Sequence, residues 1–95
     1  MIRNIVVGRL RPDIPPEAVD DALQALLDLR LEGLIEMRAG RDAGLRAGNW
    51  GYAITADFVD ADAYRRYDLE DQQNRIRREM FDPISESIAR VQFAV

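Results

Sequence analysis

Four segments of this chain alternate between two faces with a period of two residues, and two segments with a helical period lie between them. A two-residue period is that of a β-strand, and apolar residues spaced about 3.6 apart form one face of an α-helix. The alternating segments predict four strands, at Ile2–Leu10, Leu34–Asp42, Trp50–Phe58 and Ile88–Val95.

The two helical segments begin at recognisable signals. Pro15, Pro16 and Glu17 suit the first turn of a helix that we expect to end near Gly33. Asp60 is a typical N-cap for a second helical region, which continues from Leu69 towards Phe81 and ends at Asp82-Pro83. The resulting order, β-α-β-β-α-β, is that of a ferredoxin-like α+β fold with one four-stranded antiparallel sheet, and residues 1–95 form a single domain.

Two helices cover only one face of such a sheet, and the other face is not polar enough for water. Ile5 and Val7 lie opposite the Asn4 and Val6 face of the first strand, and the last strand is apolar on both sides. A chain of 95 residues has no further segment to cover this face. We therefore predict a homodimer in which two sheets close on each other as a dimeric α/β barrel.

Composition excludes several kinds of chemistry. The chain has no cysteine and no histidine, so it has no thiolate nucleophile, imidazole base, disulfide or Cys/His metal site. We expect no metal and no cofactor. The net charge of −4 does not favour a nucleic-acid partner. No apolar run spans a membrane and no segment reads as a signal peptide, so we expect no membrane partner and a cytoplasmic location.

Candidate binding residues lie on the strand faces expected to meet the helices. Trp50, Tyr52 and Phe58 share one face, where they either pack the core or stack a planar ligand. Asn4 and Val6 share a face of the first strand, and Asn4 needs a hydrogen-bond partner there, either a hydroxyl such as that of Tyr67 or Tyr52, or a ligand. Gly8 predicts a void or a bulge.

The chain resembles the stress-responsive A/B barrel (Dabb) domains over essentially its whole length. The similar features are "MIRNIVVGRL" followed by a Pro-Glu helix start, "GRD" after the second strand, "NWGYAITADFVDADAYRRY", and the terminal strand "VQFAV". The resemblance implies a ferredoxin-like homodimer with a small pocket between sheet and helices. It also implies an association with stress responses.

Plant members that act as polyketide cyclases use two histidines in that pocket, one in the first strand and one in an HPxH segment near a tyrosine. The matching positions here are Asn4 and Gln73, with the tyrosine kept as Tyr67. An amide cannot accept a proton near neutral pH, so cyclase chemistry of that type is not expected. Tyr67, Gln73 and Glu70 are the candidate catalytic residues, with Glu70 the one plausible base; the other interpretation of the segment Tyr67–Glu79 is a solvated helix surface.

Three functions follow. The first is a homodimer that binds a small apolar or aromatic molecule through Asn4, Val6, Trp50, Tyr52, Tyr67 and Gln73. The second is a cofactor-free cyclase-, isomerase- or monooxygenase-like enzyme that lacks the usual histidines. The third is a structural or interaction role through the dimer surface. The sequence does not decide whether the protein is an enzyme.

Overall fold

The computed structural model describes residues 1–95 and has the predicted order of elements. The second predicted helical region is divided into two α-helices, α2 and α3, and a π-helical turn, η1, which follows α3 directly. The elements are β1 (Ile2–Leu10), α1 (Pro16–Leu27), β2 (Leu34–Arg41), β3 (Tyr52–Phe58), α2 (Ala61–Asp68), α3 (Asp71–Ile76), η1 (Arg77–Phe81) and β4 (Ser85–Ala94).

The four strands form one antiparallel sheet in the order β2-β3-β1-β4, which confirms the ferredoxin-like fold. β1 lies in the centre, where Val6 pairs with Ile54 of β3 and with Arg90 of β4. Directly paired residues of an antiparallel sheet point to the same face. The register therefore places Asn4, Val6, Ile54 and Arg90 together on the face towards the helices.

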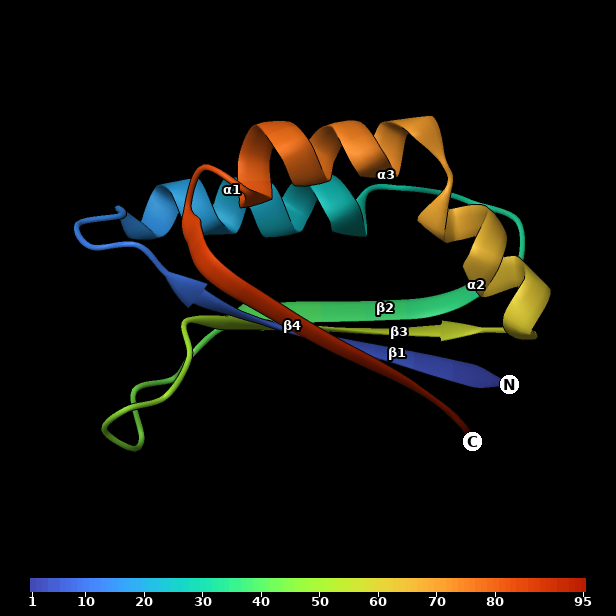
Figure 1. Ribbon diagram of the computed structural model, residues 1–95, viewed down its shortest axis with the longest axis horizontal. Coiled ribbons are helices and arrows are strands. Elements are labelled where there is room, and N and C mark those ends of the chain that lie inside the picture. Colours follow the sequence, from blue (N-terminus) through green and yellow to red (C-terminus); the bar gives the residue numbers. More distant parts are fainter.

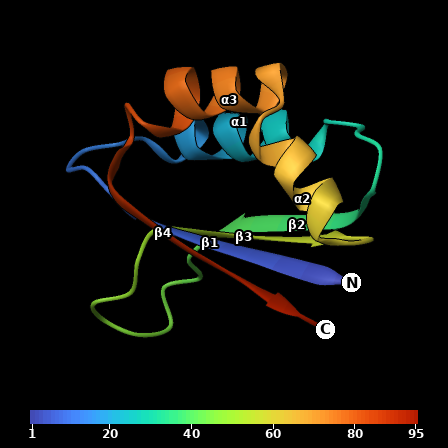
Figure 2. The same ribbon diagram turned by 45° about the vertical axis from the view of Figure 1, so that its right-hand side comes forward.

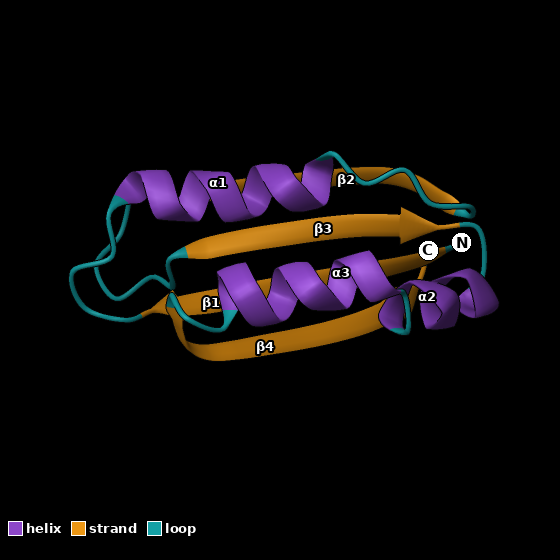
Figure 3. Ribbon diagram, turned by 90° about the horizontal axis from the view of Figure 1, so that it is seen from above, coloured by secondary structure: helices purple, strands orange, loops and turns teal.

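All the helices lie on one side of the sheet (Figures 1 and 2). Seen from above, α1 runs along β2 and β3, while α3 runs along β1 and β4 (Figure 3). The core between the layers joins one face of α1 to β3 and η1 through Val19, Ala22, Leu23, Leu26, Tyr52, Ile54, Phe81 and Ile84. A smaller cluster of Ala56, Phe58, Ala63 and Tyr67 packs α2 on the end of β3.

Helix α1 ends at Leu27, several residues before the predicted end near Gly33. The Arg30 guanidinium donates hydrogen bonds to the carbonyl oxygens of Leu27 (2.9 Å) and Leu29 (3.0 Å), and so satisfies acceptors at the end of the helix. Gly33, at φ 85°, turns the chain into β2. The predicted N-cap at Asp60 is confirmed, because its carboxylate accepts a hydrogen bond from the Ala63 backbone N–H.

The sheet face away from the helices remains uncovered in the single chain. Its residues include Ile5, Val7, Val91 and Phe93, and the last two are 55% and 43% exposed. The loop between β2 and β3 extends beyond this face (Figure 1), and Leu45 within it is 90% exposed. None of the helices has the length and hydropathy needed to cross a membrane.

Candidate functional site

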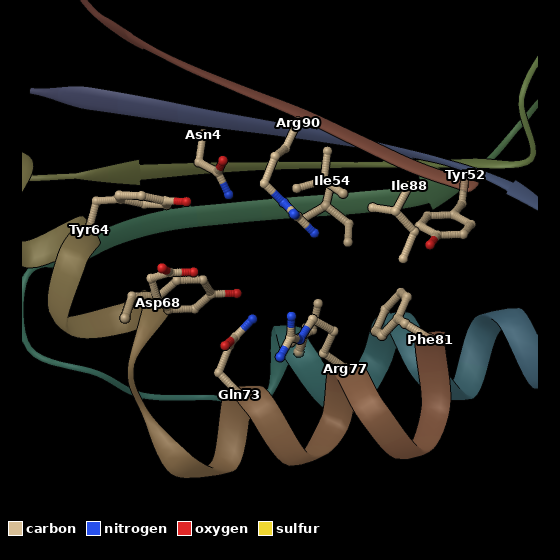
Figure 4. A pocket seen from close by; sticks show the side chains of 13 residues that line it. Asn4, Tyr52, Ile54, Tyr64, Asp68, Gln73, Arg77, Phe81, Ile88 and Arg90 are labelled. Carbon is tan, nitrogen blue, oxygen red and sulfur yellow. The ribbon is translucent and has the colours of Figure 1, made fainter. Parts of the chain in front are cut away.

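A cavity of about 70 Å³ lies between the sheet and the helix layer (Figure 4). Every strand except β2, and every helical element, contributes to its wall. The lining residues are Asn4, Val6, Leu26, Tyr52, Ile54, Tyr64, Tyr67, Asp68, Gln73, Arg77, Phe81, Ile88 and Arg90.

Asn4 is a buried amide in the sheet wall, only 5% exposed. Its Oδ1 accepts a hydrogen bond of 2.8 Å from Nε2 of Gln92, the residue paired with it on β4. The amide nitrogen of Asn4 points into the cavity (Figure 4). The partner is therefore neither of the tyrosines proposed from the sequence, and Asn4 presents a hydrogen-bond donor to the cavity.

Tyr52 closes one end of the cavity. Its hydroxyl and the Ser85 hydroxyl are 2.8 Å apart and hydrogen-bonded, and its ring packs on Phe81 at 5.4 Å between centroids. The ring lies directly over Gly8, where a Cβ would overlap it. Gly8 therefore does not leave the void expected from the sequence, because the Tyr52 side chain occupies that space. Burial raises the pKa of Tyr52, and the Ser85 hydrogen bond opposes part of that shift.

Two further tyrosines form the opposite end, from α2. Tyr67 packs on Phe58 at 5.1 Å between ring centroids, and Tyr64 packs edge-on against the same ring at 5.6 Å. Burial raises the pKa of Tyr67 to about 12, although the neighbouring Gln73 amide acts in the other direction. Burial also raises the pKa of Tyr64. All of these hydroxyls are therefore protonated at neutral pH.

Gln73 and Arg77 form the helical wall, one turn apart on α3 and η1. Arg77 Nη2 donates to Asn74 Oδ1 at 2.9 Å, but the buried Arg77 Nε has no hydrogen-bond partner in the chain. The buried Gln73 Oε1 also has none. The π-helical turn, closed by a bond from Asp82 N–H to the Arg77 carbonyl, places both Arg77 and Phe81 at the cavity. Such turns interrupt α-helices frequently at functional sites.

Five of the six predicted ligand-binding residues come together here: Asn4, Val6, Tyr52, Tyr67 and Gln73 line the cavity. Trp50 does not. Regular pairing of β3 starts at Tyr52, and Gly51 before it is a bend, so the two-residue alternation does not extend back to Trp50. The Trp50 ring instead lies under the Arg9 guanidinium, 4.8 Å from Arg9 Cζ, beside Val7 on the outer sheet face.

Glu70 does not line the cavity either. It is the N-cap of α3, and its two carboxylate oxygens accept hydrogen bonds from the backbone N–H groups of Gln72 (2.9 Å) and Gln73 (2.7 Å). This cap orients the start of α3 and so positions Gln73. The carboxylate that does reach the cavity is that of the adjacent Asp68.

Sequence reasoning missed four polar residues of the wall: Tyr64, Asp68, Arg77 and Arg90. Arg90 carried a usable signal, because it has the same strand parity as Ile88, and β4 packs against β1. Arg77 carried none, since a surface cluster with Arg75 and Arg78 is equally consistent with that stretch. No group of three or more carboxylate, histidine or cysteine side chains in the chain could hold a metal ion.

No family model matches the chain, and no curated protein is significantly similar to it in sequence. Solved structures do match over almost its full length. A dimeric ferredoxin-like protein of unknown function from Thermobifida fusca YX has 29% identity and a TM-score of 0.89, covering 99% of this chain and 90% of that one. A Dabb family protein from Mesorhizobium loti MAFF303099 has 21% identity and a TM-score of 0.75, covering 99% and 95%.

SnoaB, a cofactor-independent oxygenase from Streptomyces nogalater, is similar at 16% identity and a TM-score of 0.78, covering 99% of this chain and 91% of that one. At such low identity these likenesses establish the fold. The Dabb resemblance drawn from the sequence is thus matched at the level of fold.

Proposed function

We propose that the protein is a homodimeric, Dabb-like domain that binds a small molecule in the cavity between sheet and helices, without turnover. The observation that carries the proposal is a cavity whose wall combines apolar side chains, Val6, Ile54 and Ile88 among them, with polar groups directed into it, such as the Asn4 amide nitrogen. A concave space with apolar walls and a few convergent polar groups is the usual form of a small-molecule site.

Size limits the molecule. A cavity of about 150 Å³ is known to hold benzene, and this one measures about 70 Å³. A short aliphatic compound fits it as it stands, against Val6, Ile54 and Ile88. An aromatic compound, the other class expected from the sequence, requires the exposed Arg90 side chain to swing outward from the edge strand β4.

Dimerisation is the second part of the proposal. The outer sheet face exposes Val91 and Phe93 together with neighbouring aliphatics, and the similar proteins from Thermobifida fusca, Bacteroides fragilis and Jannaschia are described as dimeric. A second copy seated on this face would remove that apolar surface from water.

A thermal-shift screen of short aliphatic and monocyclic aromatic compounds tests the binding. We expect at least one class to raise the melting temperature of the wild type. Ile88→Trp is the matched variant, because Ile88 is half-buried and its side chain points into the cavity (Figure 4). The proposal is abandoned if no compound stabilises the wild type, or if a folded Ile88→Trp protein responds to the same compounds equally.

The alternative is a cofactor-free enzyme. Asp68 supplies the one carboxylate that lines the cavity and would act as the base. The neutral Tyr67 phenol and the Asn4 amide could donate hydrogen bonds to an enolate-like oxygen. The oxygenase SnoaB has the same fold. Asp68→Asn distinguishes the two functions, since it would abolish turnover of a bound compound but leave binding of a neutral one largely intact.

A further inference from the structure

The cavity wall carries an excess of positive charge. Three charged side chains line it, and two of them are the guanidinium groups of Arg77 and Arg90 against the single carboxylate of Asp68. The two guanidinium groups approach the same part of the cavity from opposite walls, Arg90 from β4 and Arg77 from the helix layer (Figure 4). Guanidinium groups on both sides of one space are a common arrangement for holding a planar anion.

No carboxylate of the chain neutralises these two arginines. The four ion pairs of the protein are Arg3–Asp57, Arg38–Glu36, Arg41–Asp20 and Arg65–Asp62, and none includes Arg77, Arg90 or Asp68. The Arg90 guanidinium forms no hydrogen bond within the chain, and the Arg77 guanidinium forms one, to the side-chain oxygen of Asn74. This contrasts with the arginines elsewhere on the sheet, where Arg3 and Arg38 each have a carboxylate partner.

Hydrogen-bond donors beside the two guanidinium groups specify the ligand further. The Asn4 amide nitrogen points into the cavity, and the Gln73 amide nitrogen also lies on the cavity side of its side chain (Figure 4). Tyr67, whose hydroxyl is neutral, lies beside Gln73 and lines the same cavity. An oxyanion that accepts hydrogen bonds from the guanidinium groups would therefore meet further donors there.

We propose that the cavity recognises the carboxylate of a small organic acid, held between Arg77 and Arg90, with the apolar part of the acid against Val6, Ile54 and Ile88. This inference rests on the proposed binding function and names its ligand class. A carboxylate suits the site better than a phosphate, because the space is small and the rest of an organic acid can contact the apolar residues of the wall. A hydroxy substituent on the acid would accept a hydrogen bond from the amide nitrogen of Asn4 or Gln73.

Matched pairs of acids and amides test the proposal. Calorimetric titration with propionate and propionamide, and with lactate and lactamide, compares ligands of nearly equal shape that differ in charge. We expect each acid to bind at least about tenfold more tightly than its amide, a difference of about 1.4 kcal/mol. We also expect lactate to bind more tightly than propionate. Inorganic phosphate is titrated in parallel, and binding tighter than that of both acids would overturn the assignment to a carboxylate.

Arg90→Gln is the decisive variant, because Arg90 is exposed on an edge strand and its loss should not prevent folding. We expect it to weaken acid binding about tenfold while leaving amide binding unchanged. Arg78→Gln is the control, since Arg78 is exposed, neighbours Arg77 and does not line the cavity, but its loss changes the net charge equally.

Two kinds of failure are distinguishable. If the amides bind as well as the acids, or if Arg78→Gln weakens acid binding as much as Arg90→Gln, the carboxylate proposal is wrong while the cavity remains a binding site. If neither acids nor amides bind, and the thermal-shift screen is also negative, the proposed function and this inference fail together.

Discussion

Arg3 and Asp57 form a two-point ion pair across β1 and β3 on the sheet face away from the helices. Arg3 Nε lies 2.7 Å from Asp57 Oδ1, and Arg3 Nη2 donates to Asp57 Oδ2 at 3.0 Å. The two residues are direct partners in the sheet register, so the pair links the central strand to its neighbour. A bidentate arrangement holds both side chains in one geometry. The pair thus lies on the same face as the exposed Val91 and Phe93.

This pair predicts a loss of stability in acid. The Arg3 hydrogen bond lowers the pKa of Asp57 below its usual value. A lowered folded-state pKa means that the pair stabilises the fold fully above the unfolded-state pKa of about 4, and that this contribution is lost as the pH falls through the lower folded-state value. Asp57→Asn should therefore reduce the free energy of unfolding at pH 7 and have almost no effect near pH 2, as measured by urea unfolding at a fixed protein concentration.

The matched control is Asp20→Asn, which removes the single-contact pair with Arg41 between two exposed side chains. Exposed pairs of this kind contribute little. A pH dependence of the same size in Asp20→Asn would show that general acid titration, and not the Arg3 contact, causes the effect.

Gly8 lies beneath the ring of Tyr52, so a methyl group at this position should destabilise the fold. A Cβ on Gly8 would overlap the Tyr52 ring. Moving that ring would break its hydrogen bond with Ser85 and its packing on Phe81. We expect Gly8→Ala to cost about 1–3 kcal/mol, which is a fall of roughly 4–8 °C in melting temperature for each kcal/mol in a domain of this size.

Gly40→Ala is the control, because Gly40 also lies in a strand but a Cβ there meets no atom within 4 Å. Alanine is less flexible than glycine in the unfolded chain, so this change should be neutral or slightly stabilising. Equal losses in both variants would contradict the packing explanation and point to a general intolerance of strand substitutions.

Periodicity predicted the sheet and its two faces well, because strand alternation is a local property of the chain. β1 was predicted with its observed bounds, and Asn4, Val6 and Tyr52 lie on the predicted faces. Errors arose where a side chain reaches back to the backbone. α1 ends at Leu27, where the Arg30 guanidinium donates to the Leu27 and Leu29 carbonyls, and a 3.6-residue pattern does not record such bonds.

The candidate site was also predictable only in part, because two of its features depend on turns. The sequence could not reveal that Gly51 interrupts the alternation and places Trp50 on the opposite face from Tyr52. It could not distinguish Glu70, which caps α3, from Asp68, which lies two residues earlier and lines the cavity. Both outcomes depend on where a turn directs one side chain, and a turn depends on contacts that are distant in sequence.

Tyr67 should titrate well above an ordinary phenol. Burial raises its pKa to about 12, whereas a free tyrosine ionises near 10. A phenol with a raised folded-state pKa contributes stability that is present below pH 10 and is lost as the pH rises towards 12. Ultraviolet absorbance of the phenolate during alkaline titration measures this directly. Tyr67→Phe should remove the ionisation with the highest pKa from the curve of the three tyrosines.

The corresponding variant at the other end of the cavity is Tyr52→Phe, which should remove a different ionisation and also release the Ser85 hydroxyl. An unpaired buried hydroxyl costs about 1–3 kcal/mol. If all three tyrosines ionise together near pH 10 in the folded protein, then the cavity is open to water and Tyr67 is not the buried donor that the proposed site requires.

Val91 tests the homodimer, because it lies in the aliphatic part of the outer sheet face and is 55% exposed in the single chain. Its cross-strand partner on β1 is Ile5, so an aspartate at 91 would place a charge in the middle of the proposed interface. Sedimentation velocity at micromolar concentration should give a dimer for the wild type and a monomer for Val91→Asp.

Leu69→Asp is the control, since Leu69 is 79% exposed at the end of α2, within the helix layer, and should leave the dimer intact. A monomeric wild type with a stable, cooperatively unfolding fold would contradict the homodimer while leaving the cavity and its two arginines unaffected. A Val91→Asp protein that remains dimeric would instead move the interface to another surface.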